Sequence, residues 1–124
     1  MRERGDSFSQ AVKRLREVLD APETDITRDA AIQRFEFCFE LAWKAIQEQG
    51  RREGLDCRSP VHCLKLAFKS RWIDDEGGWL AMLEDRNRTS HTYDAALAKD
   101  VFSRLPGYLP LLEALDSMLR ASSS

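Results

Sequence analysis

Residues 31–46, AIQRFEFCFELAWKAI, decide the fold of this chain. Apolar residues recur in this segment at three- and four-residue steps, which is the spacing of one face of an α-helix. One apolar face consists of Ala31, Phe35, Cys38, Leu41, Ala42, Ala45 and Ile46, and a second stripe of Ile32, Phe39 and Trp43. A helix that is apolar over so much of its circumference lies at the centre of a bundle or is also buried in a dimer.

Helical patterns continue on both sides of this segment, without strand-like alternation. The central helix is expected to begin at Asp25 or Thr27, both good N-caps, and to end at about Arg52. A helix is expected at about residues 4–20, before the central one. After it, a helix should begin at a Ser59 cap with Pro60 in first position, and another should run from Trp79 into residues 85–94. The last helix should begin at a cap formed by Thr92 or Asp94. Pro106 and Gly107 should break or kink the last helix.

These patterns predict an all-α fold, an up-and-down bundle of four main helices with a bent C-terminal helix. The chain has 124 residues, which suits a single domain with its own core. We expect this domain over residues 1–121 and a loose tail at residues 122–124.

The composition, 43% hydrophobic and 32% charged, indicates a soluble globular protein. The net charge of −2 and the pI of about 5.7 provide no global basic field, so any RNA contact must come from a local arginine and lysine cluster. No segment reads as a secretion signal or a membrane span. The odd count of three cysteines, without metal-ligand spacing, indicates a reducing compartment. We therefore expect a cytoplasmic protein.

The stretch of residues 85–94, DRNRTSHTYD, contains no aliphatic residue although amphipathic helices flank it. Its histidine can transfer protons near neutral pH, and its arginines can bind a phosphate through a fixed fork of donors. On an ideal helix Arg86 and His91 lie roughly 140° apart. For them to converge, the helix must end or loosen between them, or a second chain must bring the partner group. A polar helix end with an incidental histidine is the simpler alternative.

Two segments resemble a known family. Arg86-x4-His91-x-Tyr93 is similar to the Arg-x4-His-x-Tyr signature of the HEPN superfamily, small helical proteins encoded beside minimal nucleotidyltransferases. The segment 34–44, RFEFCFELAWK, resembles the Arg-Phe-Glu-x-x-x-Glu-Leu-x-Trp-Lys segment of its branch of nucleotidyltransferase substrate-binding proteins. The resemblance covers roughly residues 5–120.

The resemblance implies a metal-independent ribonuclease, without a cofactor, in which Arg86 and His91 are the catalytic pair. It implies a homodimer in which the two motifs meet across the interface. It also implies a toxin–antitoxin-like pairing with a small nucleotidyltransferase, which in related pairs adds AMP to the tyrosine that corresponds to Tyr93. A non-catalytic substrate-binding subunit of the nucleotidyltransferase is the alternative function. A plain helical dimerisation protein is a third possibility, which requires the motif to be coincidental.

Three further residues are expected to support the catalytic pair. Asn87, one turn before His91, would orient its ring, and Ser90 would contact phosphate as an auxiliary donor. Glu40 would orient Arg86 from a neighbouring helix, although with Lys44 it would equally form an ordinary helix ion pair. The acidic run 74–76 is expected to favour the start of the next helix rather than to hold a metal.

Overall fold

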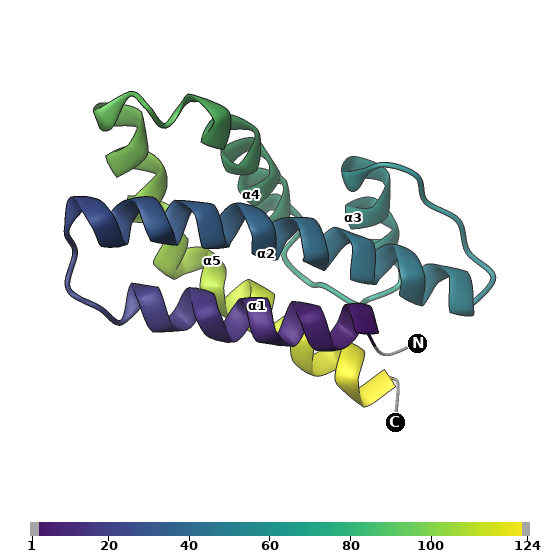
Figure 1. The fold of residues 1–124 in the computed structure, drawn as a ribbon. Coiled ribbons are helices and arrows are strands. Elements are labelled where there is room, and N and C mark those ends of the chain that lie inside the picture. Colours follow the sequence, from purple (N-terminus) through teal and green to yellow (C-terminus); the bar gives the residue numbers. More distant parts are fainter. Residues whose placement is uncertain (1–2, 123–124) are drawn as a thin grey trace.

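The computed structural model describes residues 3–122, with side chains from residue 6 onward, and shows an all-α fold (Figure 1). This confirms the predicted fold class. The elements are α1 (Glu3–Leu19), α2 (Asp25–Arg52), α3 (Pro60–Lys69), α4 (Glu76–Arg88), the short 3₁₀ helix η1 (Thr89–His91) and α5 (Ala95–Ser122). Ser122, expected in a loose tail, is the last residue of α5, and residues 123–124 lie outside the described part.

Helix α2 is the central element, because it packs against α1, α3, α4, η1 and α5. Both of its apolar stripes contribute to the core, and Phe35 and Phe39 are completely buried. The Phe35 ring stacks on Tyr108 of α5 with centroids 5.7 Å apart, and the Phe39 ring lies 6.3 Å from that of Trp79 on α4. The wide apolar surface of α2 is therefore covered largely within one chain.

Side-chain caps fix where the helices begin. The predicted caps Ser59 and Asp94 accept hydrogen bonds from the first-turn amides of α3 and α5, and Asp75 does the same for α4. Helix α2 differs from the prediction, because its N-cap is Thr24. Thr24 and Thr27 each accept a hydrogen bond from the other's backbone N–H, so Thr27 completes the cap from within the helix.

Helix α5 continues through both of its prolines. Pro106 and Pro110 lie inside the helix and on its exposed side. Proline has no backbone N–H, and on this side water can bind the carbonyl that would otherwise have accepted a hydrogen bond from it. The helix curves from α4 toward α1 along this length (Figure 1). Pro106 and Gly107 were expected to break or kink the last helix; they do not break it, and the expectation of one bent C-terminal helix holds.

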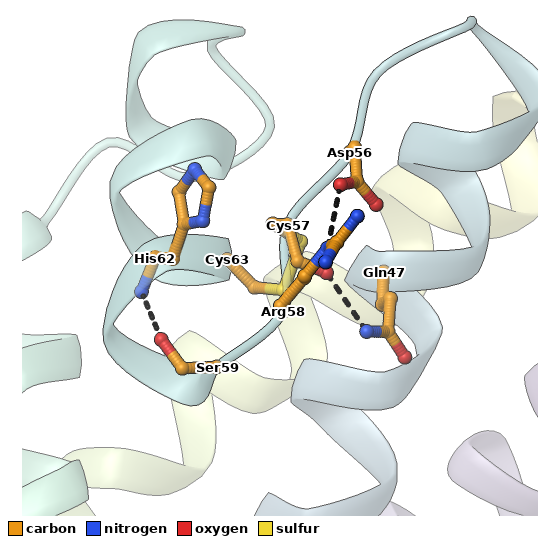
Figure 2. The surroundings of a disulfide bond; sticks show 7 residues. All are labelled: Gln47, Asp56, Cys57, Arg58, Ser59, His62 and Cys63. Atoms are coloured by element: carbon orange, nitrogen blue, oxygen red, sulfur yellow. Dashed lines mark hydrogen bonds and ion pairs between the residues drawn. A yellow bond between two sulfur atoms is a disulfide. The ribbon is translucent and has the colours of Figure 1, made fainter.

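A disulfide joins Cys57, in the loop between α2 and α3, to Cys63 of α3 (Figure 2). Both cysteines are buried, and Gln47 of α2 donates a 2.8 Å hydrogen bond to the Cys57 carbonyl. Cys38 remains a free thiol in the core. This bond was not expected, because the odd count of cysteines favoured free thiols and disulfides are uncommon in cytosolic proteins. Within residues 3–122 no helix is long and apolar enough to cross a membrane.

Candidate functional site

The polar stretch lies where α4 loosens. The α-helix ends at Arg88, and residues 89–91 continue as the 3₁₀ helix η1. Thr89 Oγ1 donates a 2.7 Å hydrogen bond to the Arg86 carbonyl, and Thr92 Oγ1 donates a 2.9 Å bond to the Thr89 carbonyl. Threonine hydroxyls that bond nearby carbonyls compete with the helical ladder. The change of helix type therefore falls between Arg86 and His91, as their convergence would require.

Arg86 points toward α2. Its Nη1 donates a 2.6 Å hydrogen bond to Glu40 Oε1, and its guanidinium carbon lies 5.5 Å from the centre of the Phe39 ring. The other oxygen, Glu40 Oε2, accepts a 3.0 Å bond from Trp43 Nε1 and lies 4.0 Å from Lys44 Nζ. Glu40 thus takes part in both of the expected interactions, the contact with Arg86 and the helix ion pair. Together these contacts hold Arg86 in one orientation.

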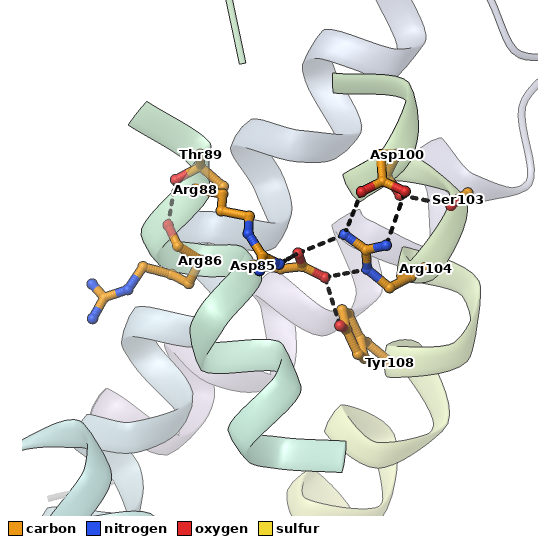
Figure 3. Close-up of polar contacts among 8 residues, drawn as sticks. All are labelled: Asp85, Arg86, Arg88, Thr89, Asp100, Ser103, Arg104 and Tyr108. Atoms are coloured by element: carbon orange, nitrogen blue, oxygen red, sulfur yellow. Dashed lines mark hydrogen bonds and ion pairs between the residues drawn. The ribbon is translucent and has the colours of Figure 1, made fainter. Parts of the chain in front are cut away.

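The residue before Arg86 is the most enclosed charge of the site. Asp85 is completely buried and forms a bidentate pair with Arg104 of α5, at 2.7 and 2.8 Å (Figure 3). It also accepts bonds from Tyr108 Oη at 2.6 Å and Arg88 Nη1 at 2.8 Å. Burial by itself raises the pKa of Asp85, but the hydrogen bonds from Arg104, Tyr108 and Arg88 outweigh it, so the pKa lies below its ordinary value. Asp85 is therefore a carboxylate at neutral pH.

His91 and Tyr93 are exposed beyond the end of α4. Their rings meet edge to face with centroids 6.1 Å apart, and Tyr93 is 86% exposed. Asn87 and Ser90 are exposed as well. Within the described residues, no hydrogen bond joins His91 to Asn87 or to Arg86. In this chain, then, Glu40 and Arg86 come together, while Asn87 does not hold the His91 ring.

Two grooves run along the same side of α2. The larger, of about 970 Å³, lies between α1 and α2 and reaches Glu40. The smaller, of about 300 Å³, lies between α2 and residues 89–93 and includes Tyr93. Gln33 and Glu36 line both grooves. The exposed Phe37 and the arginines Arg14 and Arg34 line the larger one. Glu40, the partner of Arg86, and Tyr93, the ring next to His91, therefore line open grooves that also carry aromatic and cationic groups.

The cluster formed by Asp85, Arg104 and Tyr108 is not among the residues predicted from the sequence. One signal was present. Asp85 follows the apolar Met82 by three residues, which places a carboxylate on the buried face of α4. A charge at such a position requires partners, but the pattern does not identify Arg104 and Tyr108 as those partners.

Comparisons with known proteins agree with this architecture. The family described as nucleotidyltransferase substrate binding protein like matches residues 3–121. A Haemophilus influenzae protein called probable ribonuclease HepT is 32% identical in an alignment of 84 positions, which covers 64% of this chain and 58% of that protein. This chain thus matches less than two thirds of the length of that relative.

Two solved structures share the fold across nearly their whole length. A Thermus thermophilus protein is 38% identical and superposes with a TM-score of 0.86, covering 91% of this chain and 98% of its own. A Haemophilus influenzae protein, described as having the fold of a substrate binding domain of a nucleotidyltransferase, is 27% identical with a TM-score of 0.85, covering 94% and 98%. The family match spans almost the entire described chain. The chain belongs to the nucleotidyltransferase substrate-binding protein-like family.

Proposed function

We propose that this chain is the partner of a small nucleotidyltransferase in a toxin–antitoxin-like pair, and that it is a metal-independent RNA endonuclease. The observation that carries the proposal is the fixed Arg86. Glu40 and Phe39 hold its guanidinium beside an open groove, and His91 is exposed on the loosened turn that follows. The name of the relative, probable ribonuclease HepT, supports RNA cleavage as the activity.

The proposed reaction uses the RNA's own 2′-hydroxyl as nucleophile. Its oxygen attacks the adjacent phosphorus as it loses a proton, the P–O5′ bond breaks, and the leaving oxygen gains a proton. His91 transfers a proton, while the donors of Arg86 not bonded to Glu40 stabilise charge on the phosphate. Ser90, exposed one residue before His91, is an auxiliary phosphate donor. Asn87 is proposed to orient the His91 ring only when RNA or a second chain is bound.

A second copy of the chain completes the proposed site. Within the described part of one chain Arg86 is directed at α2 and has no hydrogen bond with His91. Large apolar side chains nearby remain exposed, with Phe37 at 62% and Ile26 at 80%. Exposed apolar surface of this kind marks interfaces. We propose a two-fold homodimer that covers this side of α2 and brings the two copies of residues 86–93 together.

The test is cleavage of single-stranded RNA in the presence of EDTA, with 2′,3′-cyclic phosphate ends as the expected product. His91→Ala should lower the rate by about 10²- to 10⁴-fold. Arg86→Lys should also be inactive, because an ammonium group lacks the fork of donors. Matched controls are His62→Ala, the other histidine, which is exposed on α3, and Arg16→Lys, which alters another arginine–glutamate pair. Equal cleavage by wild type and His91→Ala, or cleavage by neither in the absence of the partner, would refute the proposed catalytic role.

A non-catalytic subunit is the second candidate function. It is favoured by the description of one structural relative as a substrate binding domain of a nucleotidyltransferase. This function requires a complex with the nucleotidyltransferase and no RNA cleavage by the isolated protein. Binding to the partner by wild type and His91→Ala alike, with neither of them cutting RNA, would identify it.

A further inference from the structure

Asp85 and Arg86 are consecutive residues that bind different helices. Asp85 reaches α5, where Arg104 and Tyr108 bind its carboxylate. Arg86 leaves the same turn in another direction, away from this cluster (Figure 3), and bonds Glu40 on α2. The last turn of α4 is thus attached at adjacent positions to α5 and to α2. Any rotation or shift of this turn relative to α5 would also move Arg86 relative to Glu40.

The attachment to α5 is the more constrained of the two. Asp85 is completely buried, and its two oxygens accept four hydrogen bonds, from Arg104 twice, Tyr108 and Arg88. Asp100, one turn before Arg104 on α5, binds the same guanidinium through two 3.0 Å bonds. Arg104 is therefore itself held in place, and it presents a rigid fork to Asp85.

We infer that Asp85 is a positioning residue for Arg86: by bonding Arg104 and Tyr108 it fixes the final turn of α4 so that Arg86 meets Glu40. This inference rests on the proposed function of Arg86, whereas the contacts of Asp85 stand independently of it. Asp85 does not touch the substrate in this scheme. It acts only through the position of the residue that follows it.

The first test follows Arg86 directly and requires no catalysis. Arg86 Nε is buried and, within the described residues, has no hydrogen-bond partner, so its N–H should give an arginine side-chain NMR signal that exchanges slowly with water. Loss of this signal in Arg86→Lys assigns it. In Asp85→Asn the signal should shift, and its exchange with water should accelerate about tenfold or more, because buried groups exchange through local opening. Arg104→Lys, which keeps the charge but not the fork, should have the same effect.

Asp116→Asn is the matched control. Asp116 is another buried aspartate, only 7% exposed, and it bonds Ser9 of α1 and Arg120 of α5 instead of α4. Its replacement should lower the melting temperature while leaving the Arg86 signal in place. If Asp85→Asn folds and its Arg86 signal is unchanged, the inference is wrong. If Asp85→Asn does not fold, Arg104→Lys takes its place, and an unchanged signal in that variant has the same meaning. The inference is equally wrong if Asp116→Asn moves the signal as much.

The second test measures RNA cleavage. A displacement of about 1 Å in a positioned group costs on the order of 10²-fold in rate, so Asp85→Asn should lower kcat by about 10- to 100-fold with little change in KM. Asp116→Asn should keep the wild-type kcat. If the Arg86 signal responds to Asp85→Asn as expected but the wild type cuts no RNA, the ribonuclease proposal is refuted and the positioning role remains supported. An active wild type whose kcat is unaffected by Asp85→Asn refutes the positioning role.

Discussion

Arg86 Nη1 and Glu40 Oε1 lie 2.6 Å apart and join α4 to α2 across 46 residues of sequence. The two oxygens of Glu40 serve different partners, because Oε2 accepts from Trp43 Nε1 at 3.0 Å. Glu40 therefore cannot rotate away from Arg86 without losing both bonds. The pair is partly exposed, at 23% for Arg86 and 34% for Glu40, so its value for stability is modest. Its main effect is to set the direction of the guanidinium.

Glu40→Gln tests this effect on Arg86. The amide keeps the size of the side chain but removes the charge, so Arg86 should become mobile and RNA cleavage should fall about tenfold or more. The free energy of unfolding should fall by only about 1 kcal/mol. Glu84→Gln is the control, because Glu84 is exposed on α4 and has no partner within the described residues. Unchanged cleavage by Glu40→Gln would remove Glu40 from the site.

Periodicity predicted most of the fold because a buried helix face is a local pattern. The stripes of α2, the Ser59 cap and the placement of Pro60 were all visible as sequence spacings of a few residues. The prolines of α5 misled for the opposite reason. Both prolines lie on the exposed side of α5, where water can reach the carbonyls that lose their N–H partner, and the neighbouring helices decide which side is exposed.

The site was only partly predictable. Glu40 was identified because it lies on the polar side of α2, although its partner is 46 residues away. The role of Asp85 was missed because its spacing from Met82 indicates only that it is buried, and no spacing within α4 indicates its partners Arg104 and Tyr108. The Cys57–Cys63 bond was missed because the odd cysteine count favoured free thiols, whereas the turn that brings these two residues together is a property of the folded loop.

Phe37→Asp should dissociate the proposed homodimer. Phe37 is 62% exposed on the side of α2 that carries the grooves, and burial of a charge at an interface costs on the order of 2 kcal/mol or more, about 30-fold in affinity. Light scattering at micromolar concentration should give a dimer for wild type and a monomer for the variant. The control is Phe68→Asp, which alters another exposed phenylalanine, 43% exposed on α3. A monomeric wild type, or a loss of dimer in both variants, would contradict the proposed interface.

The free energy of unfolding should decrease in alkali through Tyr108. Burial and the hydrogen bond to Asp85 raise the pKa of Tyr108 from 10.0 to about 12. A raised pKa in the folded state means that the neutral phenol stabilises the fold below the unfolded pKa and that this contribution is lost as the pH rises through the folded one. Urea unfolding should therefore show a constant advantage of wild type over Tyr108→Phe up to about pH 10, which shrinks toward about pH 12. An advantage that stays constant over this range would show that the bond to Asp85 has little weight.

The Cys57–Cys63 bond should be measurable as stability. Replacing both cysteines by serine should lower the free energy of unfolding by about 2 kcal/mol, and a reductant should lower that of wild type by the same amount without affecting the variant. Alkylation of unfolded, unreduced protein should label only Cys38. The pKa of the Cys38 thiol is raised to about 12 by burial and by the nearby Asp116, so the folded protein should resist alkylation. Labelling of all three cysteines would indicate that the bond is absent in solution.

Tyr93 is the predicted site of nucleotide transfer from the partner enzyme. Its phenol is 86% exposed and lies beside His91, with ring centroids 6.1 Å apart. Attack by the phenol oxygen on the α-phosphorus of ATP would form a phosphodiester and release pyrophosphate. The attached AMP would lie over the groove between α2 and residues 89–93, where it would obstruct access of RNA to His91. Transfer should therefore reduce RNA cleavage in proportion to the fraction of chains modified.

The chain provides its own control for this prediction, because Tyr108 is its other tyrosine. Tyr108 is 6% exposed and donates its hydroxyl hydrogen to Asp85 at 2.6 Å, so it should remain unmodified. After incubation with the nucleotidyltransferase, ATP and magnesium, peptide mass spectrometry should find AMP on Tyr93 alone, and Tyr93→Phe should accept none. The Tyr93→Phe protein should still cut RNA and should escape inhibition by the partner's transfer reaction. AMP found on other residues while Tyr93 stays free would refute this regulation, because an exposed phenol beside the site would then have been bypassed.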